Sequence, residues 1–522
     1  MPDNDVAQAL QEAFRKGLMD SADRLPGGNL KSALLELASG KVTQSPFPQE
    51  IVDRVRVDLR LILKRFGFGD GLPREGDVEQ DTEVRLIQDL LRAFQDPDYF
   101  FGDWWAKGVW IGSPQRRLPR IPALYERKTK WALGEGNPDL HGEWSTNYSS
   151  LKEHEQKVLE QYRAEIEGGF MTVTILREAI ERFGDSLLIA ATGAIAKKGQ
   201  GPGGDIRVIY DGTHGIFLNH GIRIRDQVRF PTAPDIKAVL AEMAEEGGPH
   251  FFLVYDVKKA HRRIPVLPSE WGRQACQVRG SAAATLQARK ARLEAEAGSS
   301  SSKDPPRASL RKSDCSEKEL EEDVYVNCVG TFGVSSAGYW WGRAGGSIIR
   351  LTHYVLGHAE ALWALLYSDD GKITGRTEHY ERGLLLHIFV LVVINLPISW
   401  KKVKGGTQTE WIGYWLDVGR FELGISESRA AWASRWLTDK ATEGRVGLGE
   451  LREGLGRLQF IAGPLEFLRR FLGPLYAWSA AGPKYAQPRL PTLIVLILKF
   501  LAAELKEVRM TACEKRASHK GE

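Results

Sequence analysis

This chain of 522 residues has few cysteines and no long hydrophobic run. The cysteines form no Cys-x-x-Cys pair, so the sequence indicates neither a disulfide framework nor a zinc site, and a reducing, intracellular compartment is expected. They are Cys276, Cys315, Cys328 and Cys513. The strongest apolar stretches, residues 384–394 and 493–503, fall short of the roughly 20 residues that a membrane-spanning helix needs. We therefore expect no membrane partner, and the choice between nucleus and cytoplasm stays open.

The charge balance is close to even. The formal net charge of +4 permits an anionic partner without requiring one. A chain of this length suggests about two to four domains, and 43% hydrophobic residues can fill ordinary cores. Residues 1–5 are polar and acidic, which is unlike a secretory signal.

The most informative feature is a pair of adjacent carboxylates, Asp369 and Asp370, placed between the apolar residues 361–366 and a Gly371-Lys372 turn. Like charges this close repel and raise a pKa unless a cation lies between them, and a divalent metal is the natural compensator. On its own, such a pair before glycine is more often a solvated hairpin tip. The surrounding segments favour the metal site over the solvated hairpin tip.

A third carboxylate, Asp256, ends the aromatic and β-branched run 251–255, which is typical of a buried strand. Residues 329–341 form a glycine-punctuated turn that opens into a helix of small and aromatic residues. Downstream, residues 400–404 form a basic turn, and residues 410–417 an aromatic-rich strand.

In order and content these segments resemble the palm of reverse transcriptases of retroelements. That family has an Asp-bearing strand, a Phe-Gly-x-x-Ser-Ala helix entry, a Tyr-x-Asp-Asp hairpin, a lysine turn and a Trp-x-Gly-Tyr primer-grip hairpin. The resemblance covers about residues 185–480. It implies an α+β, right-hand polymerase fold with fingers, a palm of antiparallel sheet plus helices, and a helical thumb.

The resemblance also implies a division of the chain. The expected regions are a mainly helical N-terminal region without an assigned function at 1–150, fingers at 151–250, palm at 251–420, thumb at 421–482, and a C-terminal helix and tail at 483–522. Within the palm, residues 280–322 combine a charged helical stretch with a Ser/Pro linker, and we expect a disordered insert between two paired strands, 274–279 and 324–328. In the first region, the aromatic row at 99–105 favours core packing over stacking on bases.

The chemistry implied by the resemblance is two-metal nucleotidyl transfer. Asp256 and Asp369 would bridge two Mg²⁺ ions, for which Mn²⁺ is an alternative, and Asp370 would assist them. The backbone carbonyl of Val257 would complete a ligand shell. The implied catalytic residues are therefore Asp256, Asp369 and Asp370.

The resemblance assigns a further set of residues to the incoming deoxynucleoside triphosphate. They are Lys197, Lys198, Arg207, His261, Phe332 and Lys402. Arg207 and either Lys197 or Lys198 would hold phosphates. Lys402 is the candidate for protonating pyrophosphate, and its neighbour Lys401 is the alternative. His261 departs from the family, which usually has an aromatic Tyr or Phe there to exclude a ribose 2′ hydroxyl, so sugar discrimination is left open.

The implied macromolecular partner is a template–primer duplex of RNA or DNA. Trp411, Gly413, Tyr414 and Arg457 would contact it, although a solvated charged face equally predicts Arg457. The expected function is that of an RNA-directed DNA polymerase. The alternative is a catalytically inactive or domesticated protein that keeps the fold and binds nucleic acid, and the sequence does not predict the oligomeric state.

Overall fold

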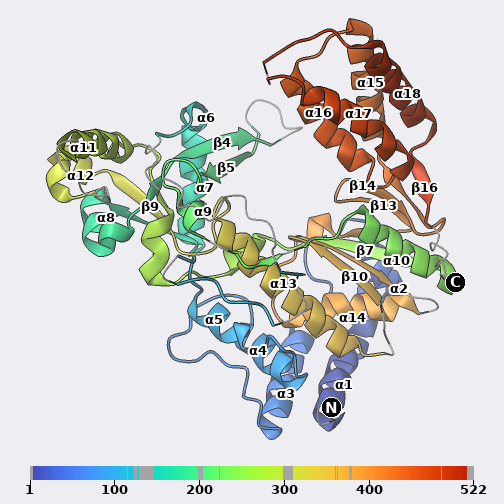
Figure 1. The fold of residues 1–522 in the computed structure, drawn as a ribbon. Coiled ribbons are helices and arrows are strands. Elements are labelled where there is room, and N and C mark those ends of the chain that lie inside the picture. Colours follow the sequence, from blue (N-terminus) through green and yellow to red (C-terminus); the bar gives the residue numbers. More distant parts are fainter. Residues whose placement is uncertain are drawn as a thin grey trace.

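A computed structural model describes most of the chain (Figure 1). The described residues are 4–113, 116–122, 126–127, 146–197, 204–222, 224–227, 229–297, 310–358, 360, 362–375, 379–483 and 485–513. Helices and strands are both abundant in them, which agrees with the expected mixture of helix and sheet. Among the described helices, none is long and apolar enough to cross a membrane.

The centre of the molecule is an antiparallel sheet with the strand order β10–β11–β7–β12. Its strands are β7 (Phe251–Asp256), β10 (Leu362–Tyr367), β11 (Asp370–Gly375) and β12 (Lys404–Gly406). All of β7 is buried, as its aromatic and β-branched composition predicts. Helices α13 (Ser335–Leu356) and α14 (Tyr380–Val393) cover one face, where Leu253 and Ile373 enter the main hydrophobic core.

The other face of the central sheet packs against helix α10 and a second antiparallel sheet. These elements are α10 (Ala233–Glu246), β13 (Gln408–Trp411), β14 (Tyr414–Asp417), β15 (Glu422–Ile425) and β16 (Met510–Ala512). Phe252 and Val254 of β7 share a core there with Ile236 of α10 and Leu416 of β14. The central sheet is therefore buried on both faces, and its strand ends are left to carry polar groups.

A third sheet, in the order β2–β9–β8–β3, joins segments that are far apart in the sequence. Its strands are β2 (Met171–Ile175), β3 (Ile189–Ala190), β8 (Ala275–Cys276) and β9 (Asp323–Asn327). Near it in Figure 1 lie α6 (Ser149–Glu153), α7 (Glu155–Glu167), α8 (Leu176–Phe183), α9 (Leu218–Gly221) and the hairpin of β4 (Thr192–Ala196) and β5 (Ile206–Tyr210). The short strands β1 (Glu126–Arg127) and β6 (Asp226–Gln227) form a separate antiparallel pair. The sheet therefore combines strands from both sides of residue 250, where the boundary between fingers and palm was expected.

The base of the insert forms as predicted, but the described parts of the insert are ordered. Strand β8 pairs antiparallel with β9, which places Ala275 opposite Val326 and confirms the predicted pairing. Instead of a disordered loop, the structure shows helices on either side of residues 298–309, which lie outside the described residues. They are α11 (Ala282–Ala297) and α12 (Glu317–Leu320). The buried side chains of Leu286 and Leu320, and an Arg289–Asp314 ion pair, tie these helices to the fold.

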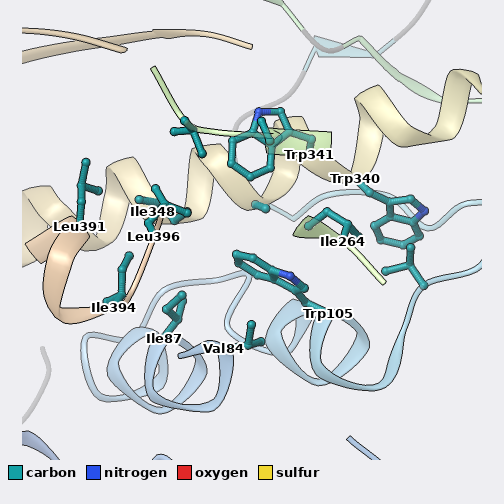
Figure 2. Close-up of a cluster of buried hydrophobic side chains, with 14 of the residues drawn as sticks. Val84, Ile87, Trp105, Ile264, Trp340, Trp341, Ile348, Leu391, Ile394 and Leu396 are labelled. Carbon is teal, nitrogen blue, oxygen red and sulfur yellow. The ribbon is translucent and has the colours of Figure 1, made fainter. Parts of the chain in front are cut away.

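The N-terminal helices form a layer below α13 and α14 (Figure 1). They are α1 (Asn4–Ser21), α2 (Leu30–Ala38), α3 (Gln49–Arg65), α4 (Val84–Ala93) and α5 (Phe101–Lys107). Figure 2 shows Trp105 of α5 facing α13, which carries Trp340. Arg343 of α13 also forms a fully buried ion pair with Asp98, with Nε 2.8 Å from Oδ2. The complete burial of Trp105 supports the packing interpretation of the aromatic row at 99–105.

A helical unit with its own hydrophobic core stands at the C-terminal end of the chain (Figure 1). Its helices are α15 (Glu427–Glu443), α16 (Leu448–Ile461), α17 (Arg469–Ser479) and α18 (Thr492–Glu507). Leu498 and Leu501 of α18 share this core with Leu437 of α15. The unit therefore extends through residue 507, beyond the thumb expected at 421–482, because the apolar side of α18 covers α15. Part of the expected tail forms β16 and completes the second sheet.

Candidate active site at the end of the central sheet

Three carboxylates meet at one end of the central sheet. Asp370, the first residue of β11, lies directly opposite Asp256, the last residue of β7, in antiparallel register. Asp369 and Ser368 form the turn that joins β10 to β11. Directly opposed residues in such a ladder have Cβ atoms about 4.5–5.5 Å apart, so these like charges are close neighbours. We call residues 367–370 the aspartate hairpin.

The turn of the aspartate hairpin is strained and is held from two sides. Ser368 has a φ of 55°, a left-handed conformation that glycine adopts readily and that costs other residues on the order of 1–2 kcal/mol. The indole Nε1 of Trp341 donates a hydrogen bond to the Ser368 carbonyl at 2.8 Å. The backbone N–H of Val257 donates to the Asp369 carbonyl at 2.9 Å. Helix α13 and the end of β7 together fix the turn.

Asp256 is nearly buried, with 8% of its surface exposed, and both of its carboxylate oxygens have protein partners. Ser399 Oγ donates to Oδ1 at 2.6 Å, and Lys402 Nζ donates to Oδ2 at 2.8 Å. The Lys402 side chain is 64% exposed, so it can leave this position without breaking a core. The structure thus places Lys402 as the counter-ion of a carboxylate.

The negative charge of the cluster is only partly compensated. The pKa of Asp370 is raised to about 6, first by burial and then by the charges of Asp369 and Asp256, while Lys402 lowers it. Carboxylate oxygens are the ligands that Mg²⁺ and Mn²⁺ prefer, so the donor set fits a hard divalent cation. Among the described residues, no three Asp, Glu, His or Cys side chains surround a common point as they stand. Asp256 would first have to exchange Lys402 for the cation.

A second group of predicted residues converges beside the aspartate hairpin. The guanidinium of Arg207 lies 5.8 Å from the centre of the Phe332 ring, and the His261 ring meets Phe332 edge-on at 6.2 Å. Burial lowers the pKa of His261, and the charge of Asp369 acts in the opposite direction. Phe332 is 57% exposed, so its ring offers a surface to a ligand. The arrangement can accept a flat, anionic molecule.

A close backbone approach brings Arg207 and Phe332 together. Gly333 has a φ of 108°, and a Cβ added to it would lie 1.9 Å from the carbonyl oxygen of Tyr210, at the end of β5. The side chain of Asn219 donates to the Gly333 carbonyl at 2.8 Å and accepts from the Ser335 N–H at 2.8 Å. Only glycine fits this crossing, and the crossing sets β5 against the start of α13.

Of the two lysines predicted to bind phosphate, the structure describes Lys197. Lys197 follows β4, and its Nζ lies 3.3 Å from Oδ2 of Asp205 across the hairpin. Both side chains are at least half exposed, so this ion pair adds little stability and can open. Lys198 lies outside the described residues.

The residues predicted to grip the primer form a second tight hairpin, residues 411–414, which we call the aromatic hairpin. Ile412 and Gly413 both have positive φ, 44° and 84°. The ring of Tyr414 lies flat on Phe460 of α16, with the ring centres 4.4 Å apart. Trp411 is 4% exposed, and its Nε1 has no hydrogen-bond partner within the described part of the chain. Trp411 therefore acts as a core residue beneath the hairpin.

The two hairpins are neighbours. Burial raises the pKa of Tyr414, and the hydroxyl of Tyr367, in the aspartate hairpin, raises it further.

On the helical unit, Arg457 of α16 lies 4.7 Å from the centre of the Trp432 ring of α15. Trp432 is 37% exposed, so this pair faces solvent on the surface formed by α15 and α16.

Several residues of the site carried no signal in the sequence. Ser399, Trp341 and Trp432 gain their places only through tertiary packing, and nothing in their local sequence distinguishes them from other serines and tryptophans. Trp341 is one of 15 tryptophans. A helical pattern places it on α13 without indicating that it reaches the turn at Ser368.

The sequence matches no protein-family model, and a search of curated proteins finds no relative. Among solved structures, the chain is similar to a foamy viral protease-reverse transcriptase (dRH) in complex with double-stranded DNA, with a TM-score of 0.44, 12% identity, and coverage of 72% of this chain and 52% of that one. A foamy viral protease-reverse transcriptase in complex with an RNA/DNA hybrid has a TM-score of 0.42 and 11% identity, and the match covers 72% of this chain and 39% of that one. A foamy viral protease-reverse transcriptase in complex with double-stranded DNA has a TM-score of 0.44 and 12% identity, and the match covers 92% of this chain and 75% of that one.

The chain thus spans about half the length of the first of these structures. At such TM-scores the likeness identifies no family. The case for a function rests on the strand register and the site described above.

Proposed function

We propose that this protein is an RNA-directed DNA polymerase that extends a primer on an RNA or DNA template. The observation that carries the proposal is the direct pairing of Asp256 with Asp370 beside the turn residue Asp369. Burial, and then the charges of Asp369 and Asp256, raise the pKa of Asp370 and so disfavour its charged form. Catalytic sites typically hold ionisable groups with perturbed pKa values close together. The three carboxylates have this arrangement at an accessible strand end.

When bound among these carboxylates, two Mg²⁺ or Mn²⁺ ions would supply Lewis acidity at the phosphoryl group and would favour ionisation of the primer 3′ hydroxyl. In this proposal the carboxylates of Asp256, Asp369 and Asp370 would hold the ions, and the Val257 carbonyl would be a further ligand. Lys402, once displaced from Asp256, would donate a proton to the departing pyrophosphate. Ser399 keeps its hydrogen bond to Asp256 and orients that carboxylate.

The remaining residues position the substrates. Arg207 holds the phosphates of the deoxynucleoside triphosphate because a guanidinium can bind phosphate oxygens in pairs. Phe332 and His261 form the floor and edge of the pocket for its base and sugar. The aromatic hairpin and the Trp432–Arg457 pair hold the template–primer duplex.

Primer extension tests the proposal directly. Purified protein with oligo(dT) annealed to poly(rA), dTTP and MgCl₂ should lengthen the primer, and EDTA should stop the reaction. Asp256→Asn should abolish extension, and Asp185→Asn, at an exposed carboxylate away from the site, should not. Duplex binding without extension in Mg²⁺ or Mn²⁺ would favour the inactive, nucleic-acid-binding alternative.

A further inference from the structure

The turn that carries Asp369 depends on a contact from outside its own strands. Trp341 is 1% exposed, and its indole Nε1 reaches the Ser368 carbonyl at 2.8 Å. One helical turn later, Gly345 leaves room for β10, because a Cβ added there would lie 2.6 Å from Cδ2 of Leu366. Helix α13 therefore lies close enough to β10 for an indole to bridge the helix and the turn.

We propose that Trp341 is a positioning residue for the metal-binding carboxylates, because its N–H fixes the peptide plane between Ser368 and Asp369. This inference rests on the proposed function. The Ser368 carbonyl and the Asp369 N–H belong to one planar unit, so a hydrogen bond to that carbonyl limits rotation on both sides of the plane. Those rotations set the direction in which the Asp369 side chain leaves the backbone.

The need for such a hydrogen bond follows from the conformation of Ser368. A serine at φ 55° tends to relax towards negative φ, and that change would turn the peptide plane and move the carboxylate with it. The Asp369 carbonyl is held separately by the Val257 N–H at 2.9 Å. The indole therefore holds the one side of the turn that β7 does not reach.

The chain contains a matched control for this role. Trp340 is also 1% exposed, and its Nε1 also donates to a backbone carbonyl, that of Trp110, at 2.8 Å. Figure 2 shows Trp340 and Trp341 at separate places along α13. The change to phenylalanine removes the same donor and the same volume from either residue, but only Trp341 is tied to the aspartate hairpin.

The test compares Trp341→Phe with Trp340→Phe in the full chain bound to a template–primer duplex. Mn²⁺ affinity is measured from the electron paramagnetic resonance signal of the free ion, and single-nucleotide incorporation is followed in a single turnover. In Trp341→Phe we expect Mn²⁺ to bind about fivefold more weakly and incorporation to slow by about 10- to 100-fold at fixed Mg²⁺, as for a carboxylate displaced by about 1 Å. Higher Mg²⁺ should restore part of the rate. Trp340→Phe should change both quantities less than about twofold, and duplex affinity should be unchanged in both.

Equal effects of the two variants on Mn²⁺ affinity would overturn the role of Trp341. If Trp341→Phe does not fold, Trp341→benzothienylalanine, introduced by nonsense suppression, keeps the ring shape and removes only the N–H, and it must show the same loss. The outcome is separable from failure of the proposed function. If the wild-type protein extends primers but the two variants behave alike, only the role of Trp341 is overturned. If the wild-type protein neither binds Mn²⁺ nor extends primers, the role of Trp341 and the proposed function are both overturned.

Discussion

The aspartate hairpin and the aromatic hairpin are both tight turns with left-handed residues, yet they are stabilised in opposite ways. In the aromatic hairpin, Ile412 and Gly413 both have positive φ, which matches the twist of the flanking strands. Its side chains pack well against a neighbouring helix, because the ring of Tyr414 lies flat on Phe460 of α16. In the aspartate hairpin, the charged residues repel, and hydrogen bonds from Trp341 and Val257 hold the turn from outside.

In the proposed function, this difference would separate an element that binds the duplex from an element that holds the metal ions. A hairpin whose aromatic side chains pack against a neighbouring helix can present a rigid surface. A hairpin whose residues destabilise it persists only because the surrounding fold imposes it, and such strain is concentrated where chemistry occurs. We therefore expect changes in the aspartate hairpin to affect the rate of reaction, and changes in the aromatic hairpin to affect duplex affinity.

The largest expected effect is that of Asp369→Asn. Loss of a charged metal ligand should reduce primer extension on the order of 10³-fold or more, while duplex binding stays the same or becomes slightly tighter because repulsion of phosphate is removed. Single-turnover extension and a duplex titration measure the two quantities. Extension within tenfold of wild type would remove Asp369 from the metal site.

His261→Tyr tests the proposed nucleotide site. A bulkier ring at the edge of Phe332 should increase the preference for deoxynucleotides over ribonucleotides by about 10- to 200-fold, since it would meet the 2′ oxygen. The ratio of the two kcat/KM values, measured for both proteins, gives the answer. An unchanged ratio would mean that His261 does not face the sugar.

Gly413→Ala tests the aromatic hairpin. The new Cβ would lie 2.6 Å from Nη2 of Arg429 at a φ of 84°, so the turn should distort and the dissociation constant of the duplex should rise about tenfold. The incorporation rate at saturating duplex should stay within about threefold of wild type, because the carboxylates do not move. Gly473→Ala, on α17 with nothing within 4 Å of the added Cβ, is the matched control. A loss confined to the rate would reverse the proposed division between the hairpins.

The smallest expected effect is on stability. The pKa of Asp370 is raised from 3.8 to about 6, so the folded state binds more protons than the unfolded state between these pH values, and this group's contribution to stability falls as the pH rises through that window. Without metal, Asp370→Asn should stabilise the protein by about 1 kcal/mol at pH 7, after solvent screening, and much less at pH 4. Urea unfolding in EDTA at the two pH values measures this. An equal effect at both pH values would contradict the raised pKa of Asp370.

Local sequence predicted the parts of the site that depend on strand ends. Asp256 follows a buried aromatic run, and Asp369 and Asp370 precede a glycine, so their positions at the ends of β7 and β11 could be expected. The pairing of β8 with β9 could be expected for the same reason. The helices of the insert could not be expected, because they depend on the burial of Leu286 and on the Arg289–Asp314 ion pair.

Contacts between distant segments were beyond the reach of local patterns. The hydrogen bond from Trp341 to Ser368 joins a helix to a turn, and the bond from Ser399 to Asp256 spans 143 residues. The packing of α18 against α15 likewise depends on which apolar face finds which partner, so the helical unit is longer than expected. Periodicity predicts that such faces exist but does not say where they meet.

In the proposed function, the aspartate hairpin and the end of β7 hold the catalytic metal ions. Fe²⁺ bound in place of Mg²⁺, with ascorbate and peroxide, cleaves the polypeptide next to its ligands, and mass spectrometry locates the breaks. We predict cleavage near residues 256 and 368–370 that excess Mg²⁺ suppresses and that Asp369→Asn removes. Cleavage elsewhere in the chain, with none at these two segments, would contradict the account.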